Sequence, residues 1–366
     1  VSQTIDWLVG NMQDKNGGFY SSVNADSEEG EGEFYLWKYS EIEKILNKEE
    51  VQEFAQAYDI KEEGNFTEEK SLPRRNYKIE EEGKSYLEHK NKILAFRNKR
   101  IEPTRDKKNI AVWNSLLIRG LVDASRAFYR KDWLQIAIDL NEWMSKSLLS
   151  NQNEVSSISF ENNQLSQLSF LDDYAIWAES LLCLSSLSDW VKPGSSSSYI
   201  KQAESLTLSA IEKFKDKQIC GFYFSEEQND NPAQVRKKFW YDNATPSANS
   251  SLLRVFSTLY QLTDKEVWLT EFKEARAGYP NLCRQAPQGI GQALSSIAEE
   301  AVGLVTLTCP ITQIDEIVHK ISQKPYRPIF ISSLKENLKT NGILRIGKTF
   351  EDEVKETDQL IETLFS

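Results

Sequence analysis

The sequence GGFYSSVNADS, residues 17–27, separates two stretches whose patterns predict helices, residues 2–12 and 40–58. Its adjacent glycines permit a sharp backbone turn, and an acidic segment rich in aromatic residues follows. A partial echo, CGFYF, occupies residues 220–224 and leads to FWYDNATPSANS at residues 239–250. Such loops between helices predict a cleft in which aromatic rings stack on sugar faces while carboxylates and amides bind hydroxyl groups. The alternative interpretation is two tight turns with packed aromatic residues.

Apolar residues recur at helical spacing in a series of further segments. These predicted helices span residues 85–100, 109–129, 132–149, 170–187, 199–214, 247–262 and 265–277. Helices, polar loops and short turns alternate over residues 1–300, which predicts a mainly α fold whose repeated hairpins form a toroid rather than a four-helix bundle. Residues 61–83 are polar and predict a long surface loop, whereas residues 154–160 alternate like a short strand.

The pattern changes near residue 301. Strands are predicted at residues 302–309, 327–331 and 343–346, with a turn at Asn341-Gly342, and helices at residues 311–322 and 352–365. Residues 301–366 therefore predict a small C-terminal α/β segment.

The composition bounds the class of protein. A length of 366 residues suffices for one large helical domain or two smaller ones. The net charge of -11 argues against a nucleic-acid partner and against a polybasic membrane contact, and no apolar run approaches the ~18 residues that would span a bilayer. Four widely spaced cysteines predict free thiols in a reducing cytosol. We therefore expect a cytoplasmic protein without a metal or other cofactor, and a fragment of a longer chain, since Val1 falls inside a predicted helix.

Ordered motifs carry a family resemblance. They are GGFYSSVNADSEEGEGEFYLW from residue 17, YDIKEEGNF from residue 58, RIEPTRD leading to Trp113-Asn114, FLDDYA from residue 170, and YDNATPSANS from residue 241. Together they resemble the motifs of the YyaL and spermatogenesis-associated protein 20 family of thioredoxin-domain-containing proteins. The resemblance covers most of the chain.

The resemblance implies a thioredoxin-like domain followed by an (α/α)6 toroid similar to those of N-acylglucosamine 2-epimerase, cellobiose epimerase and six-hairpin glycosidases. The chain would begin partway into the toroid, so no redox activity is assigned to it, and the thioredoxin-like domain of the full chain is an expected partner. Substitutions in the family motifs occur at Asn24, Lys107, Ser115, Asn243 and Ala248, and a family cysteine pair is missing around residues 344–350. These departures indicate either a changed substrate or a weakened site.

The available acids and bases limit the chemistry. Sugar epimerisation in the related toroids uses histidines, but only His89 and His319 occur, and both are predicted to be surface residues. Glycoside hydrolysis needs two carboxyl groups about 5 to 9.5 Å apart. The candidate catalytic carboxylates are Asp26, Asp106, Asp172, Asp173 and Asp242. Adjacent carboxylates in a first helical turn also have a structural interpretation, because they offset the helix dipole.

Aromatic, amide and hydroxyl side chains in the same motifs are the candidate ligand-binding residues. They are Trp37, Arg105, Trp113, Asn114, Tyr174, Trp240, Tyr241, Thr245, Ser247 and Asn249; Ser247 is also a predicted helix N-cap. The sequence thus predicts a toroid that binds or processes a small molecule such as a saccharide, by glycosidase-like or isomerase-like chemistry. The alternative hypothesis is a non-catalytic scaffold for the thioredoxin-like domain, and a metal hydrolase is a weaker third.

Overall fold

The computed structural model describes residues 1–27, 30–78, 84–227, 235–333, 342–348, 350–353 and 357–365. The chain divides into two compact units, unit 1 (Val1–Tyr20 and Lys107–Ser366) and unit 2 (Ser21–Asp106). Three parts of the predicted loops and turns lie outside the described residues: Glu28 and Glu29, residues 79–83, and Asn341. The proposed division at residue 300 stays a prediction.

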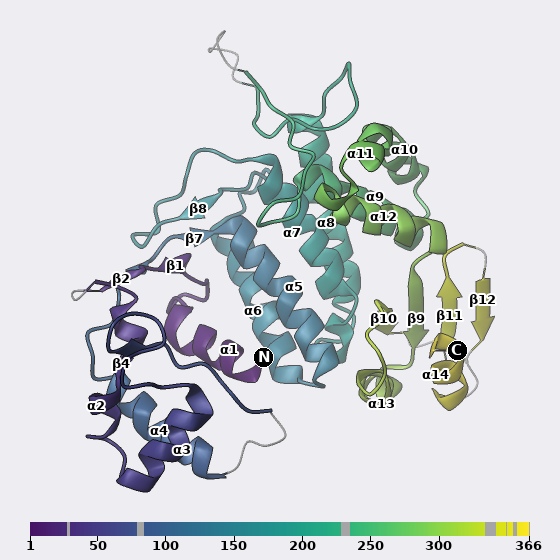
Figure 1. Ribbon diagram of the computed structural model, residues 1–366. Helices are drawn as coiled ribbons and strands as arrows, with labels where there is room; N and C mark the ends of the chain where they lie inside the picture. The colour runs from purple at the N-terminus through teal and green to yellow at the C-terminus, as the bar shows by residue number, and fades with distance from the viewer. Residues whose placement is uncertain are drawn as a thin grey trace. The chain divides into compact units, whose positions relative to one another are not determined.

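Consecutive helical hairpins form most of unit 1. They pair α5 (Ala111–Ala127) with α6 (Lys131–Ser147), α7 (Leu171–Ser185) with α8 (Ser196–Phe214), and α9 (Ala248–Thr263) with α10 (Glu266–Arg276). In addition α7 packs against α5 and α9, and α9 packs against α12 (Gly291–Val302) (Figure 1). The helices α5, α7, α9 and α12 therefore form an inner layer, with α6, α8 and α10 outside it. The predicted mainly α class, with hairpins of the toroid type, is confirmed.

The inner helices α5 and α7 run parallel. Arg119 of α5 donates to Glu179 of α7 at 2.7 Å, and Arg126 donates to Ser186 at 2.9 Å, so both contacts join residues 60 positions apart. Because the sequence separation between contacting residues stays at 60, the two helices point the same way and begin at the same end of the layer. Helix α7 is buried around almost its whole circumference, because α5, α8 and α9 surround it and its sequence is apolar on all sides.

Shorter elements complete the helical part of unit 1. Helix α1 (Ser2–Trp7) continues into a wider helical turn (η1, Leu8–Met12). Together they span the predicted helix over residues 2–12. The predicted strand over residues 154–160 is reduced to β8 (Ile158–Ser159), which pairs with β7 (Asn109–Ile110). Several elements were not predicted: the inner helix α12, the strand β7, η4 (Ser188–Trp190), α11 (Pro280–Gln285) and η5 (Pro287–Gly289).

The C-terminal α/β segment contains a sheet with strand order β10-β9-β11-β12. Its elements are β9 (Val305–Cys309), α13 (Ile311–Ser322), β10 (Phe330–Ser333), β11 (Ile343–Ile346), β12 (Phe350–Glu353) and α14 (Thr357–Phe365). β10 is parallel to β9, which α13 makes possible as the crossover connection, whereas β11 and β12 are antiparallel neighbours. Strand β12 was not predicted, and the last helix starts five residues later than the predicted 352–365 because that strand precedes it.

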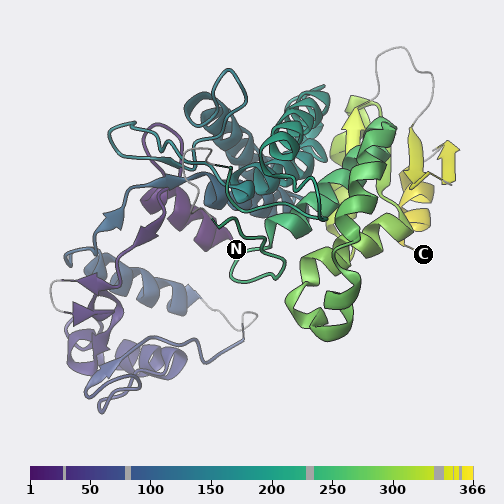
Figure 2. The ribbon, with the colours of Figure 1, turned by 90° about the horizontal axis from the view of Figure 1, so that it is seen from above.

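Hydrogen bonds attach this segment to the helices of unit 1. Ile331 N donates to Ser186 O at 2.7 Å, and Asp189 accepts from the backbone N of Ser333 at 2.7 Å. On the other side of the segment, Asp315 of α13 pairs with Lys131 at 2.6 Å and accepts from Trp190 at 2.8 Å. The ammonium group of Lys131 is the main cause that lowers the pKa of Asp315 to about 2. Figure 2 shows the segment, in yellow, beside the green helices α9 and α12.

Unit 2 contains short helices, α2 (Tyr39–Ile42), α3 (Lys48–Tyr58) and α4 (Lys84–Arg97), with the short turn η2 (Glu33–Tyr35). Its two-residue strand pairs join β1 (Ser22–Val23) to β6 (Arg105–Asp106), β2 (Asp26–Ser27) to β3 (Gly30–Glu31), and β4 (Trp37–Lys38) to β5 (Lys70–Ser71). The core comprises buried apolar side chains: Trp37, Ile42, Leu46, Val51, Phe54, Ile60 and Ile93.

One helix was predicted over residues 40–58, but unit 2 has two, α2 and α3. Asn47 causes the break: its Oδ1 accepts from the backbone N of Glu49 at 3.1 Å and of Glu50 at 3.0 Å. The Glu50 carboxylate accepts in turn from Asn47 N at 3.1 Å. This reciprocal cap starts a new helix. Across the described part of the chain, no helix is both long and apolar enough to traverse a bilayer.

Candidate ligand-binding site

Two buried asparagines hold the glycine–aromatic loops at the start of the inner helices. Asn114 of α5 accepts from Phe19 N at 2.9 Å and donates to Phe19 O at 3.1 Å. Asn249 of α9 accepts from Phe222 N at 2.8 Å and donates to Phe222 O at 3.0 Å. The echo between the two loops is therefore a repeated structural device. Both amides, predicted to position a ligand, are occupied by the backbone instead.

Tryptophan rings cover the glycines of the same loops. A Cβ at Gly18 would lie 2.5 Å from the ring of Trp143, and one at Gly221 would lie 2.4 Å from the ring of Trp240. A Cβ at Gly278 would also lie 2.4 Å from the ring of Trp240, and Tyr279 meets that ring edge-on at 5.1 Å. Trp240 is thus half-buried and packs against the backbone at Gly221 and Gly278.

We expect Gly221→Ala to lower the free energy of unfolding by about 2–3 kcal/mol, because the new Cβ overlaps Trp240 and Gly221 has a φ of +92°. Urea titration of the variant measures this. Gly120→Ala is the matched control, since nothing lies within 4 Å of a Cβ at this exposed position in α5. The control should stabilise by about 0.5–1 kcal/mol, and equal effects of the two changes would contradict the packing argument.

The loop before α7 brings two carboxyl groups to the start of that helix. Asp173 is buried and accepts from Phe170 N at 2.8 Å and from the Ser157 hydroxyl, so it caps α7. Burial is the main cause that raises the pKa of Asp173 to about 6. The preceding Asp172 is half-buried, no described residue donates a hydrogen bond to it, and burial alone raises its pKa to about 6.

Asp242 joins the starts of two inner helices. Its Oδ1 accepts from Ser247 N at 2.9 Å, before α9, and its Oδ2 accepts from Gln292 N at 2.8 Å, in the first turn of α12. Ser247 stands at the predicted N-cap position, but its hydroxyl donates to Phe239 O at 2.8 Å, so the capping carboxylate comes from Asp242. Both oxygens of Asp242 are therefore used by the backbone.

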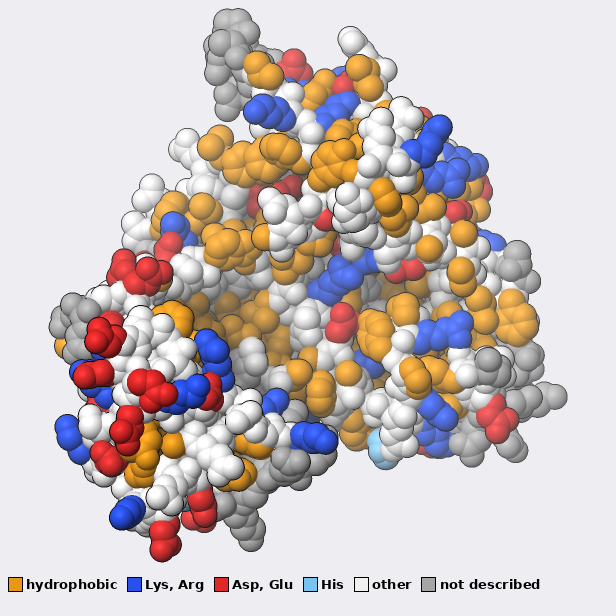
Figure 3. All heavy atoms as spheres, in the orientation of Figure 1, with side chains coloured by type: hydrophobic (Ala, Val, Ile, Leu, Met, Phe, Trp, Pro, Cys, Tyr) orange, Lys and Arg blue, Asp and Glu red, His pale blue; other side chains and the backbone are white. Residues whose placement is uncertain are grey.

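Aromatic side chains surround this end of the inner layer, and we call them the aromatic rim: Trp113, Phe170, Phe224, Phe239 and Tyr241. The rings of Phe170 and Phe224 stack at 4.7 Å, and Phe224 meets Phe239 edge-on at 5.2 Å. Trp113, Phe239 and Tyr241 are each exposed over about half of their surface. Figure 3 shows hydrophobic side chains gathered over the loops that precede α7 and α9.

Two further residues of unit 1 that were predicted to bind a ligand, Tyr174 and Thr245, make contacts within the protein. Tyr174 is fully buried, its hydroxyl accepts from Val155 N at 3.0 Å, and its ring contacts Phe214 at 5.5 Å. Thr245 is half-buried in the turn before α9, where its carbonyl accepts from Asn243 N at 3.0 Å. Tyr174 is therefore a core residue rather than a cleft residue.

The remaining predicted residues belong to unit 2. Trp37 is 2% exposed beneath the guanidinium of Arg100, whose carbon lies 4.1 Å from the ring centre, so it packs in the core instead of lining a cleft. Asp26 is exposed on β2, and Asp106 lies on β6. Arg105 pairs with Glu102 at 2.6 Å. That Asp26 and Asp106 meet the carboxylates of unit 1 at one site stays a prediction.

Both histidines were predicted at the surface, and for His89 this is wrong. His89 is buried against α3, with Nε2 3.8 Å from Glu50 and Nδ1 3.9 Å from Glu53. His319 is exposed and lies beside the ring of Tyr129 at 4.8 Å. Among the described residues, no three His, Cys, Asp or Glu side chains come close enough to hold a metal ion.

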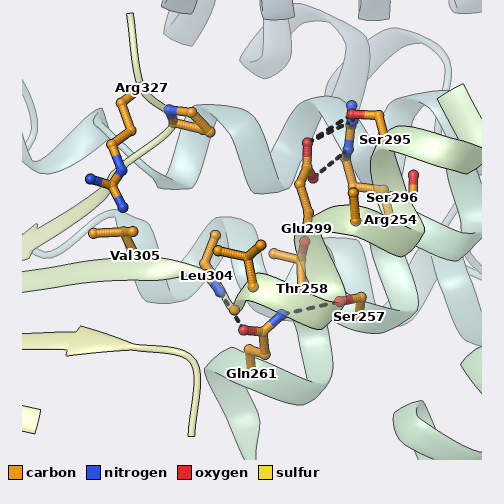
Figure 4. A pocket seen from close by; sticks show the side chains of 14 residues that line it. Arg254, Ser257, Thr258, Gln261, Ser295, Ser296, Glu299, Leu304, Val305 and Arg327 are labelled. Atoms are coloured by element: carbon orange, nitrogen blue, oxygen red, sulfur yellow. Dashed lines mark hydrogen bonds and ion pairs between the residues drawn. The ribbon is translucent and has the colours of Figure 1, made fainter. Parts of the chain in front are cut away.

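A charged cluster deep in the inner layer escaped the sequence analysis. The Glu179 carboxylate, 5% exposed, accepts from Arg119 at 2.7 Å, Arg254 at 3.0 Å and Gln292 at 2.8 Å. Arg254 also pairs with Glu299 at 2.9 Å, on one wall of a pocket of about 310 Å³ with Arg327 across from it (Figure 4). The available signal was the presence of charged residues inside otherwise apolar helices.

The inner and outer layers define a class of protein built from helical hairpins. Solved structures similar to the chain include a D-mannose isomerase (15% identity, TM-score 0.41, covering 76% of this chain and 84% of that one). A GH76 alpha-mannanase of Bacteroides thetaiotaomicron (12%, 0.42, 98% and 92%) and cellobiose 2-epimerase of Spirochaeta thermophila (11%, 0.37, 76% and 67%) are also similar. TM-scores near 0.4 are too low to assign an architecture. The assignment made above rests on the helix packing alone.

Curated relatives are similar over most of the chain. It is 24% identical over 331 residues to the uncharacterized protein B0495.5 of Caenorhabditis elegans, which covers 80% of this chain and 44% of the relative. It is 21% identical over 348 residues to spermatogenesis-associated protein 20 of Homo sapiens, which covers 81% and 42%. The predicted similarity to that protein is thereby confirmed, and the chain spans less than half of these relatives' length. No protein-family model matches the chain.

Proposed function

We propose that unit 1 is a carbohydrate-active toroid that binds a saccharide at the aromatic rim, with Asp172 as its ionisable group. Exposed aromatic rings supply flat apolar surfaces that suit the faces of a sugar ring. The neighbouring carboxyl group supplies a hydrogen bond to a hydroxyl or glycosidic oxygen. The sugar isomerase, epimerase and glycosidase named above agree in substrate class with this proposal.

The state of Asp172 carries the proposal. Its pKa of about 6 places the change of charge near neutral pH, which is the range in which a carboxyl group serves as a general acid or base. The structural carboxylates differ from it, because Asp173 Oδ2 accepts from Phe170 N and the Ser157 hydroxyl and both oxygens of Asp242 accept from backbone amides. Asp172 thus retains its hydrogen-bonding capacity for a ligand, in glycosidase-like or isomerase-like chemistry.

Asp172→Asn provides the test, in two measurements. The first is the thermal shift caused by mannose, cellobiose and manno-oligosaccharides: the wild-type protein should be stabilised by one of these classes, and the variant should lose that shift. Trp113→Ala should lose it as well. Asp139→Asn, at an exposed position on the outer helix α6, is the control and should keep it.

The second measurement is stability against pH. Because the folded pKa of Asp172 is raised from 3.8 to about 6, its contribution to stability is complete below pH 3.8 and is lost as the pH rises through 6. Relative to the wild type, Asp172→Asn should therefore gain up to about 3 kcal/mol between pH 4 and pH 7. A stability difference between the two proteins that does not change with pH would contradict the ionisation argument. Absence of a thermal shift with every saccharide would contradict the proposed function.

A second candidate function, a non-catalytic scaffold for a thioredoxin-like domain of a longer chain, has one observation in its favour. Asn114, Asn249, Asp173 and Asp242 all bind the backbone, so the family motifs preserve the shape of the helical layer. Recovery of that domain by the chain, together with no saccharide shift, would favour the scaffold.

A further inference from the structure

A cavity of about 360 Å³ lies in unit 1 between the inner helices and the segment that leads into β10. This volume falls within the roughly 300–1,000 Å³ of small-molecule sites. Its lining contains three arginines and three acids: Arg119, Arg126, Arg254, Asp123, Glu179 and Glu299. In the middle of the face that unit 1 presents in Figure 3, Lys or Arg and Asp or Glu side chains lie next to one another.

The acids of the cavity already have donors. Glu179 is bound by Arg119 and Arg254 at 2.7 and 3.0 Å, and Arg254 also neutralises Glu299. Asp123 accepts from the Tyr326 hydroxyl at 2.9 Å. The formal charges of the six side chains cancel. Arg119 and Arg254 form ion pairs with the acids, whereas Arg126 forms no ion pair with any described residue.

Arg126 is a buried cation without a carboxylate partner. It is 4% exposed, its Nη2 donates to the Ser186 hydroxyl at 2.9 Å, and its Nε has no acceptor among the described residues. A guanidinium group does not lose its proton in a protein, and an unpaired buried charge costs several kcal/mol. Arg126 lines the cavity, and the N–H donors of a guanidinium group match the oxygens of phosphate or carboxylate.

We propose that this cavity binds a small molecule through a phosphate or carboxylate group, with Arg126 as the principal anion-binding side chain and Arg119 and Arg254 beside it. Cys183 in the lining does not oppose the anion, because burial raises the pKa of its thiol to about 12. Ser186 follows Asp172 by fourteen positions along α7, about 20 Å at the helical rise. The anion site is therefore distinct from the saccharide site, and the anion proposal does not depend on the proposed function.

Binding of simple anions tests the proposal. Sodium phosphate, glucose 6-phosphate, glucuronate and neutral glucose are titrated at millimolar concentration and constant ionic strength, by calorimetry and thermal shift. Phosphate or glucuronate should bind and raise Tm, whereas glucose should not act through this cavity. Comparison of glucose 6-phosphate with glucuronate decides between the two anionic groups.

Variants at Arg126 assign the binding to the cavity. Arg126→Gln should weaken the anion affinity at least tenfold, and Arg126→Lys, which keeps the charge but loses the fork, should weaken it several-fold. Arg284→Gln, at an exposed position in α11, should bind as the wild type does. Failure of both anions to bind, or equal affinity in the Arg126 and Arg284 variants, overturns the proposal. If Arg126→Gln does not fold, the Arg126→Lys affinity decides alone.

Discussion

Glu179→Ala should lower the free energy of unfolding by about 3–5 kcal/mol, because it removes a buried carboxylate that pairs with two arginines. The carboxylate sits among Arg119, Arg254 and Gln292, and its loss leaves Arg119 without an ion pair among the described residues. Arg254 keeps Glu299, so most of the cost arises at Arg119. Urea unfolding at neutral pH, followed by circular dichroism, measures the change.

The control for this change is a glutamate in an exposed ion pair. Glu142 of the outer helix α6 pairs with Lys192 at 2.8 Å, with both side chains about half-exposed, and Glu142→Ala should cost less than about 1 kcal/mol. Glu179→Gln should fall between the two, because it keeps hydrogen-bonding atoms and loses the charge. Similar losses for Glu142→Ala and Glu179→Ala would show that the cluster makes no special contribution to stability.

Asn249→Ala should cost about 3–4 kcal/mol, because the amide makes two hydrogen bonds to buried backbone and a third to part-buried backbone. Besides its two bonds to Phe222, Nδ2 donates to Phe239 O at 3.1 Å. Asn114→Ala should have an effect of the same size, since Asn114 binds Phe19 in the same way and also donates to Ile110 O at 3.0 Å. Chemical denaturation of the two variants compares them directly.

Asn151→Ala is the matched control for both asparagines. Asn151 is exposed in the turn after α6, and its replacement should change stability by less than about 0.5 kcal/mol. If Asn249→Ala and Asn114→Ala unfold at the same urea concentration as this control, the two amides do not hold their loops. Loss of saccharide binding at unchanged stability would restore the original prediction that these amides position a ligand.

Periodicity alone predicted most of the helices, because each buries one face against its neighbours and that face is written in the local sequence. The helices α5 to α10 begin and end within a few residues of their predicted positions. The break between α2 and α3 was missed because the apolar residues keep their helical spacing across it, and only the contacts of Asn47 show that a second helix begins there. Unit 2 was not separated, since β1 and β6 pair residues more than eighty positions apart.

The roles of the candidate site residues were harder to predict than the helices. The motifs identified the residues at the start of the inner helices, but residue types could not reveal whether an amide or carboxylate faces a ligand or the backbone. Asn249 and Asp242 satisfy buried N–H groups, whereas Asp172 satisfies none among the described residues. Arg126 and Glu179 went unnoticed because their contacts join helices 60 or more positions apart.

The wall of the anion cavity that is formed by residues 326–330 follows every helix that lines it. During synthesis on the ribosome the inner helices emerge first, and the cavity has no cover until this late segment arrives and Ile331 bonds to Ser186. Docking of β10 is therefore the step that completes the wall of this cavity.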